Sequence, residues 1–339
     1  MRSFIARTAA AVLLLSPIAG TAACGADKAA EPGKAAAGSE KLTLTLNWVP
    51  YGEHAPFYYG LKKGYYKAEG IDLEIKPGNG SGNVIKAVDQ KQTDIGWADT
   101  PVLIRSVATG MKVKSVGVFL QKGPTSIQFL ADKNIKSPAD LKGKTVGGTP
   151  GDAIYVTFPA WLKANGVDPK DVKVVNVDAA GKIAALAEGR VDAIQGFFHD
   201  QSPTIEAKTN KKMDRLLYAD WGMNLLGTGI VVHDDTLKAK SDLIKKFVRA
   251  TQKSWAEAAK DVPGAVDAMA ELADNEPAKA VLTKQLNLGL TLLDAGSGQP
   301  GVNAESKWTE TLDIMAKNAD LKDPGAPAKY WDKSFTAAS

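Results

Sequence analysis

The stretch LNWVPYGEHAPFYYG, residues 46–60, decides how the rest of the chain is interpreted. It directly follows Leu42 to Leu46, the first segment with the alternation of a β-strand, and it brings Trp48, Glu53 and His54 together with further aromatic rings. A solvated loop does not need so many rings, and a core segment does not need the carboxylate and the imidazole. Rings with one or two polar groups are the composition of a pocket for a flat, polar heterocycle.

Outward from this stretch, short apolar runs alternate with runs of helical spacing. Strands are predicted at 42–46, 71–75, 94–97, 113–119, 144–147, 172–177, 192–198, 215–218 and 229–233. Helices are predicted at 56–69, 83–90, 100–109, 153–165 and 181–188, and the chain is nearly all helical from 236 onward. This order predicts an α/β protein in which helices cover parallel strands.

The first 23 residues have the composition of a secretory signal peptide. Arg2 and Arg7 provide the positive start, and the apolar run from Ala9 to Leu15 is too short to span a bilayer. Without this segment the formal charge falls from +4 to +2, and no basic cluster is present. The charge pattern therefore argues against a nucleic-acid partner.

Cys24 is the only cysteine of the chain, so no intramolecular disulfide can form. Cleavage before Cys24 followed by lipid attachment to its sulfur would anchor the protein outside the cytoplasm, at the periplasmic or outer face of the membrane. The preceding residues are similar to a bacterial lipobox, except that Thr21 stands where leucine is usual. Ordinary secretory cleavage at the same place is the alternative. Residues 24–40 are small, polar and without periodicity, which predicts a flexible tether.

Polar and aromatic side chains gather where the predicted strands end. In an open α/β sheet, ligands bind beyond the carboxyl ends of the strands, where helix N-termini present free N–H groups. The candidate ligand-binding residues at these points are Trp48, Glu53, His54, Ser81, Asn83, Asp99, Thr149, Gly151, Asp152, Tyr155, Phe198, His199, Asp200, Trp221 and Thr228.

Each candidate also has a structural alternative. Trp48 can be a core ring at a strand end, and His54 can be a buried histidine with internal partners. Asp99 and Asp152 stand where helix caps are expected. The glycine-rich turn around Ser81 lacks the spacing of a phosphate-binding loop.

Catalytic and metal-binding motifs are not found in the sequence. The histidines at 54, 199 and 233 are far apart and lack the spacing of metal ligands. Neither a Gly-x-Ser-x-Gly elbow nor a glycine fingerprint for a dinucleotide occurs. We therefore expect no metal, no cofactor and no enzymatic activity.

Several motifs resemble those of one protein family. Asn47-Trp48-x-Pro50-x-x-x-His54 and the segment 64–71 resemble the opening of substrate-binding proteins for the thiamine pyrimidine precursor. Motifs at 94–96, 137–144 and 188–193 are similar to landmarks of a wider group that also holds nitrate, sulfonate and taurine binders. The resemblance covers about 42–250, and the Trp-Pro-His opening is its specific part.

The resemblance implies a type II periplasmic-binding-protein fold, with mixed sheets flanked by helices and a ligand cleft between two lobes. It places lobe 1 at 41–128 plus 234–339 and lobe 2 at 129–233, with hinge strands near 127–130 and 229–233. It also implies a monomeric receptor that delivers a small molecule to an ABC permease in the cytoplasmic membrane. Trp48 would stack on the ligand ring, Glu53 and His54 would contact ring nitrogens or an exocyclic amine, and residues around 151–155 and 198–200 would close over it.

Two alternatives stay open. The first is a binding protein for sulfonate, nitrate, taurine or an aromatic solute of another kind. An anion would need N–H, basic or hydroxyl groups at helix N-termini, and Asp99 and Asp152 count against an anion there. A pyrimidine synthase shares the opening motif but uses pyridoxal phosphate on a lysine and a histidine four residues later. Those positions match Ala98 and Val102 in this sequence, and the cysteine-rich iron site of the enzyme is absent, so the resemblance favours binding.

Overall fold

The computed structural model describes residues 38–150, 152–293, 298–318 and 321–336, which belong to the compact unit that starts at Ala37. The predicted signal peptide, Cys24 and nearly all of the predicted tether lie outside the described residues. The first strand begins at Glu40, where the tether was predicted to end. No described helix combines the length and the apolar composition that crossing a bilayer requires.

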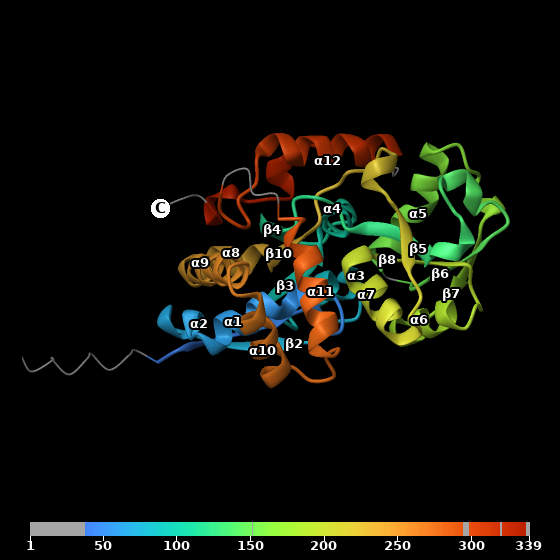
Figure 1. Ribbon diagram of the computed structural model, residues 1–339. Coiled ribbons are helices and arrows are strands. Elements are labelled where there is room, and N and C mark those ends of the chain that lie inside the picture. The colour runs from blue at the N-terminus through green and yellow to red at the C-terminus, as the bar shows by residue number, and fades with distance from the viewer. Residues whose placement is uncertain (1–37, 151, 294–297, 319–320, 337–339) are drawn as a thin grey trace, which may run out of the picture. The chain divides into compact units, whose positions relative to one another are not determined.

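The first sheet is mixed and contains the strand that follows the tether (Figure 1). Its order is β2 (Ile71–Lys76), β1 (Glu40–Thr45), β3 (Ile95–Asp99), β10 (Thr228–His233) and β4 (Val113–Val118). β1 runs parallel to β2 and β3, whereas β10 runs antiparallel to both of its neighbours. The carboxyl ends of β1 and β3 therefore meet at one edge, which is where Trp48 and Asp99 were predicted to lie near each other.

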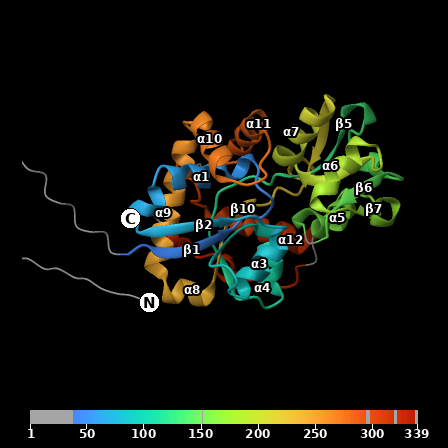
Figure 2. The ribbon, with the colours of Figure 1, turned by 90° about the horizontal axis from the view of Figure 1, so that it is seen from below.

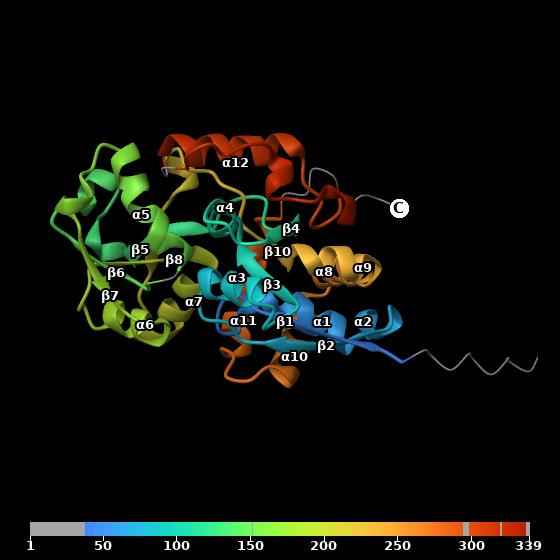
Figure 3. The same cartoon turned by 180° about the vertical axis from the view of Figure 1, so that it is seen from behind.

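Helices cover both faces of this sheet, as Figures 2 and 3 show from two sides. One face carries α3 (Ser81–Asp89) and α4 (Thr100–Ala108), and the other carries α1 (Ala55–Lys62), α2 (Tyr65–Ala68), α9 (Ser241–Ala258) and α10 (Val262–Leu272). α8 (Asp234–Ala239) follows β10 directly and packs on β10 and α9. The core between this sheet and its helices is built on aromatic rings: Trp97 of β3 lies 5.0 Å from Phe57 and 5.5 Å from Trp255, measured between ring centres. The predicted helix 56–69 is broken into α1 and α2 because Gly64 adopts φ +73°, which side chains rarely tolerate.

The second sheet repeats the arrangement of the first. Its order is β7 (Lys173–Asn176), β6 (Thr145–Gly148), β8 (Ala193–Phe197), β5 (Thr125–Leu130) and β9 (Met213–Leu217). β6 is parallel to β7 and β8, and β5 is antiparallel to β8 and β9. α5 (Ala153–Ala164), α6 (Ala179–Ala187) and α7 (Phe198–Thr209) flank it, and the core contains Phe158 and Trp161 of α5.

The chain passes between the two sheets twice, once between β4 and β5 and once between β9 and β10. In each sheet the antiparallel strand is the one that arrives from the other sheet. The predicted boundaries placed 229–233 in lobe 2, but β10 pairs with β3 and β4 of the first sheet, so this part of the expectation is corrected. We propose that the second lobe spans 125–217, between the two crossings. β5 and β10 are full sheet strands rather than hinge strands.

Two C-terminal helices bridge the lobes. α11 (Lys279–Leu290) packs on both the 3-10 turn Gly52–His54 of the first lobe and α7 of the second. α12 (Glu305–Asn318) packs on α5, and Thr311 accepts a hydrogen bond of 3.1 Å from the backbone N–H of Leu226. Further 3-10 turns lie at Ala131–Lys133, Pro138–Leu141, Pro169–Asp171, Ala219–Trp221, Pro327–Lys329 and Lys333–Phe335.

Candidate binding site between the lobes

A small cavity lies between the two lobes. Its walls are Asn47, Trp48, Tyr51, Gly80 and Ser81 of the first lobe and Asp152, Ile154, Phe197, Asp200 and Gln201 of the second. The cavity measures about 20 Å³, which is room for about one water molecule. A small-molecule ligand therefore requires the lobes to move apart, as in hinged domain closure.

The first-lobe wall is a loop that the backbone holds in place. Gly80 donates its N–H to the carbonyl of Asn47 at 2.8 Å, and Gly78 donates to the carbonyl of Trp48 at 3.0 Å. A Cβ atom at Gly78 would lie 1.7 Å from the carbonyl oxygen of Leu46. Only glycine permits the two loops to approach this closely, and their contact fixes the backbone from which the Trp48 ring lines the cavity.

His54 lies behind this wall and is fully buried. Its Nε2 bonds to Oδ1 of Asn47 at 2.8 Å, and its Nδ1 accepts the N–H of Tyr51 at 3.4 Å. Burial lowers the pKa of His54 to about 3, so the ring is neutral. Because both ring nitrogens have protein partners and the side chain does not line the cavity, His54 shapes the loop rather than making the predicted contact with a ligand.

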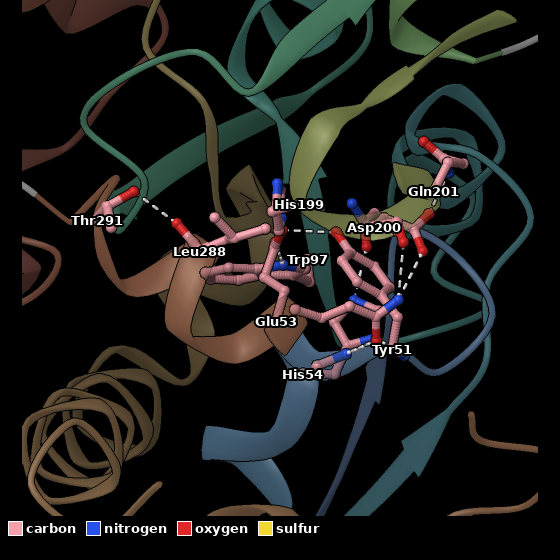
Figure 4. Close-up of polar contacts among 12 residues, drawn as sticks. Tyr51, Glu53, His54, Trp97, His199, Asp200, Gln201, Leu288 and Thr291 are labelled. Atoms are coloured by element: carbon pink, nitrogen blue, oxygen red, sulfur yellow. Dashed lines mark hydrogen bonds and ion pairs between the residues drawn. The ribbon is translucent and has the colours of Figure 1, made fainter. Parts of the chain in front are cut away.

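Glu53 connects the lobes from a fully buried position (Figure 4). Its Oε1 accepts from Nε1 of Trp97 at 2.6 Å, and its Oε2 accepts from the hydroxyl of Tyr51 and from Nε2 of His199, each at 2.5 Å. Burial alone would raise the pKa of Glu53, but the hydrogen bond and charge of His199 lower it on balance. Three donors surround this carboxylate, so Glu53 holds the two lobes together in this structure, and its contact with a ligand stays a prediction.

Three further carboxyl groups lie at or near the cavity. Asp152 and Asp200 line it, and Asp99 is buried within reach of the charge of Asp152. Lys182 is the cation that faces them; its side chain is 1% exposed, and its Nζ lies 2.9 Å from Asp152 and 5.1 Å from the centre of the Trp48 ring. The site is therefore rich in acceptors of hydrogen bonds and poor in positive charge.

Burial sets the protonation of two of these carboxyls. It raises the pKa of Asp99 to about 8, with repulsion from Asp152 adding to the effect. It also raises the pKa of Asp200 to about 7, where the opposing charges of His199 and Lys182 do not cancel it. Oδ1 of Asp99 has no hydrogen-bond partner among the described residues.

These shifts predict that the protein becomes less stable as the pH rises from 5 to 8. In this window the folded state keeps protons on Asp99 and Asp200 that the unfolded chain, with ordinary aspartate pKa values, has released. Each group therefore lowers the free energy of unfolding by up to about 1.4 kcal/mol per pH unit. Urea unfolding at pH 5, 6, 7 and 8 measures the slope, and Asp99→Asn is expected to flatten it. Stability that rises with pH across this window in the unaltered protein would contradict the assignment.

The remaining first-lobe candidates divide between the site and the surface. Ser81 lines the cavity and accepts the N–H of Asp99 at 3.1 Å. Thr228 is fully buried beside Asp99 across the β3–β10 pair, and its hydroxyl has no partner among the described residues. Asn83 is exposed and bonds to the carbonyl of Asn79, so it does not belong to the site.

The candidate residues of the second lobe also lie in different places, some near the cavity and others in the core or toward the surface. Thr149 is buried with an unpartnered hydroxyl, while Tyr155 donates to Asn176 at 2.9 Å on the outer side. Phe198 is a core ring with the guanidinium of Arg215 4.6 Å from its centre. Trp221 packs against the core outside the cavity. Gly151 lies outside the described residues.

The sequence interpretation missed several residues of the site. Tyr51 stands inside the opening stretch and Gln201 one residue past the predicted group 198–200, so proximity to the motifs was an available signal. Gln285 of α11 had none: its Oε1 accepts the N–H of Gly52 at 2.9 Å and its Nε2 donates to the carbonyl of Asp200 at 2.8 Å. Lys182 lies in a helical run without any distinguishing pattern.

A larger hollow of about 860 Å³ lies elsewhere, over α2 and α9, with Tyr65, Glu69, Arg249, Lys253 and Phe335 among its walls. Its walls come from the first lobe and the C-terminal segment, and Arg249 is paired with Glu69 at 2.8 Å. We place the ligand between the lobes instead, since that is where the buried polar side chains without partners gather. Among the residues that the structure describes, no group of His, Cys, Asp and Glu is arranged to hold a metal ion.

Two lobes of mixed sheet, joined by two crossings and enclosing a cavity, define the periplasmic-binding-protein fold. The alkanesulfonate-binding protein SsuA from Xanthomonas axonopodis pv. citri has a similar structure, with a TM-score of 0.65 at 16% identity over 88% of this chain and 99% of that one. Residues 52–264 match the NMT1/THI5-like family. Since this match covers more than half of the chain, the protein belongs to the NMT1/THI5-like family.

The relatives of this chain include proteins named as binding proteins and proteins named as synthases. The riboflavin-binding protein RibY of Chloroflexus aurantiacus is 28% identical over 84% of this chain and 83% of its own length. The formylaminopyrimidine-binding protein of Halalkalibacterium halodurans is 22% identical over 84% of this chain and 87% of its own. The 4-amino-5-hydroxymethyl-2-methylpyrimidine phosphate synthase THI5 of Saccharomyces cerevisiae is 26% identical over 64% of this chain and 66% of its own.

Proposed function

We propose that this protein is the extracytoplasmic solute receptor of an ABC importer and binds a small, flat heterocycle that presents N–H donors. A thiamine pyrimidine precursor, which carries an exocyclic amine, is the first choice. One observation carries the proposal: the carboxyl groups of Asp152 and Asp200 line a cavity that is also walled by the Trp48 indole, and Asp99 is buried close to Asp152. An aminopyrimidine supplies a flat ring that can stack on the indole and N–H donors for the carboxyl oxygens.

The charges at the cavity also oppose the anion alternative. A sulfonate or nitrate would have to approach the carboxylate of Asp152, and the Lys182 ammonium is already paired with that carboxylate at 2.9 Å. The raised pKa values of Asp99 and Asp200 leave these carboxyls partly or largely uncharged near pH 7, so they offer an anion no attraction. Riboflavin stays a candidate, since its ring is also flat, carries an N–H donor, and is bound by RibY according to that relative's name.

Binding requires opening and closing of the lobes. The two crossings, at 119–124 and 218–227, are the hinge segments we propose, since the chain passes there from one sheet to the other. Ligand would enter the open cleft, stack on Trp48 and displace the Lys182 ammonium from its ring. Contacts from α7 and from the loop before α5 would then close over it.

The delivery route follows from the N-terminal segment. We propose that Cys24 is lipidated after removal of residues 1–23, so that a tether of residues 24–39 holds a monomeric receptor at the outer side of the cytoplasmic membrane. There it would pass its ligand to an ABC permease. The synthase alternative is opposed by Ala98 and Val102, which are buried core residues without a reactive side chain.

Isothermal titration tests the ligand class. We expect binding of 4-amino-5-hydroxymethyl-2-methylpyrimidine or riboflavin, and none of taurine, an alkanesulfonate or nitrate, because only the heterocycles match the acceptor-rich cavity. Binding of an anion and of neither heterocycle would refute the proposal. Absorbance after mixing with pyridoxal phosphate checks the synthase alternative, for which a Schiff-base band would be required.

A further inference from the structure

Gln195 is a buried carboxamide without partners. The side chain is fully buried on β8, and neither Oε1 nor Nε2 has a hydrogen-bond partner among the described residues. Buried polar groups are almost always paired, since an unpaired one loses its hydration without compensation. The donor and the acceptor of the Gln195 carboxamide therefore call for hydrogen-bond partners from a molecule that is not part of this chain.

A second glutamine of the same sheet shows the ordinary arrangement. Gln128 on β5 is equally buried, but its Oε1 accepts from the hydroxyl of Ser202 at 2.5 Å and its Nε2 donates to Gln201 at 3.3 Å. Gln128 pairs with Ile194 in the β5–β8 register, so it lies on the opposite face of the sheet from Gln195. The Gln128 carboxamide, on the face of the sheet toward α7, thus has its hydrogen-bond partners, whereas the Gln195 carboxamide on the other face has none among the described residues.

Gln195 lies behind the wall of the ligand cavity, on a strand whose end lines it. Phe197, two residues further along β8, lies on the same face and lines the cavity, so Gln195 lies one step deeper behind it. On the neighbouring strand β6, a Cβ atom at Gly148 would come within 2.6 Å of Gln195 Oε1 and 2.9 Å of Tyr155 Cδ2. Only glycine fits at position 148, because the Gln195 carboxamide and the Tyr155 ring already occupy the place of a side chain.

Two more unpartnered groups come from the same part of the second lobe. The hydroxyls of Thr149, which follows Gly148, and of Tyr218, which follows β9, are buried and have no partner among the described residues. Tyr218 stacks on Trp161 of α5 with ring centres 4.4 Å apart, and burial and the nearby charge of Asp152 raise its pKa well above the usual value. Its hydroxyl therefore stays protonated and can donate.

We propose that Gln195, with Thr149 and Tyr218, forms a subsite that binds the ring edge on which a hydrogen-bond donor and an acceptor stand side by side. Such an edge is the amidine edge of an aminopyrimidine or the imide edge of a flavin. A carboxamide offers the complementary pair and can make two parallel hydrogen bonds to it. This inference rests on the proposed function and deepens it. It assigns the carboxyl groups to isolated N–H donors of the ligand, and Gln195 to the edge of the ligand ring that presents a donor beside an acceptor.

The test compares ligands that differ only at that edge. The variant Gln195→Leu keeps the volume and removes both polar atoms. With 4-amino-5-hydroxymethyl-2-methylpyrimidine or riboflavin, whichever the unaltered protein binds, titration is expected to show a loss of about 10- to 100-fold in affinity, as two neutral hydrogen bonds imply. With the analogue that lacks the 4-amino group, or with N3-methylriboflavin, the unaltered protein is expected to bind weakly and the variant to change that affinity less than threefold.

A stability measurement separates this role from a structural one. Gln195→Leu removes unsatisfied atoms, so its urea midpoint is expected to stay equal or to rise. Gln128→Leu, the matched change on the other face, takes the partner from Oε1 of Gln201 and from the hydroxyl of Ser202 and is expected to lower the midpoint. A lower midpoint for Gln195→Leu, or an affinity loss that is the same for the edge-blocked analogues, would overturn the inference.

The outcomes also distinguish the two proposals. If the unaltered protein binds the pyrimidine or riboflavin and Gln195→Leu binds it equally well, the subsite is refuted and the proposed function stands. If the unaltered protein binds neither heterocycle, the proposed function is refuted and the subsite with it.

Discussion

Replacing Glu53 with alanine is expected to lower the free energy of unfolding by about 3–5 kcal/mol, the usual effect of removing one partner from a buried charged network. The variant leaves the hydroxyl of Tyr51, Nε1 of Trp97 and Nε2 of His199 buried without their acceptor. Domains of this kind have only about 5–15 kcal/mol of stability in total. Urea unfolding monitored by circular dichroism measures the loss.

The control is the same substitution at the surface. Glu271 is 60% exposed and paired with Lys62 of α1, so Glu271→Ala is expected to change the free energy of unfolding by less than about 1 kcal/mol. Glu53→Gln keeps one carbonyl acceptor and the side-chain volume, and should fall between the two. If Glu53→Ala matched Glu271→Ala, Glu53 would not connect the lobes as described.

Much of the fold could be predicted from short-range patterns. Strands such as β2 and β8 were predicted within one residue at each end, because alternation and flanking glycines are local signals. The helix 56–69 was predicted too long, because composition does not reveal that Gly64 adopts a left-handed conformation. The assignment of 229–233 to lobe 2 failed for a different reason: its pairing with 95–99 joins segments more than a hundred residues apart.

The candidate site was predictable in place but not in detail. Residues that follow parallel strands do converge on one cavity, which is why Trp48, Asp152 and Asp200 were identified. The direction of a side chain within such a loop is set by distant partners. The Glu53 side chain turns into the interior because its hydrogen-bond donors Trp97 and His199 lie there, and they are 44 and 146 residues away in the sequence. Gln195 was missed since it lies inside a strand, where only the lack of a partner distinguishes it.

Replacing Trp48 with alanine is expected to weaken ligand binding by about 10- to 100-fold, as the loss of one ring-stacking platform implies. The indole lines the cavity, and the Lys182 ammonium lies over its ring, 5.1 Å from the ring centre. A planar ligand can replace that ammonium, whereas it cannot displace rings that are packed in the core. Titration with the pyrimidine or riboflavin measures the effect, and Trp48→Phe should retain most of the affinity.

Trp221 provides the matched control, since it is a half-buried tryptophan that packs on the core outside the cavity. Trp221→Ala is expected to lower the thermal midpoint while leaving the affinity of the folded protein unchanged. The pair of variants separates a ring that supports the fold from a ring that contacts the ligand. Equal affinities for Trp48→Ala and the unaltered protein would show that the ligand does not stack on this ring. The acceptor groups of Asp99, Asp152 and Asp200 would then have to account for the binding of a heterocycle without the indole.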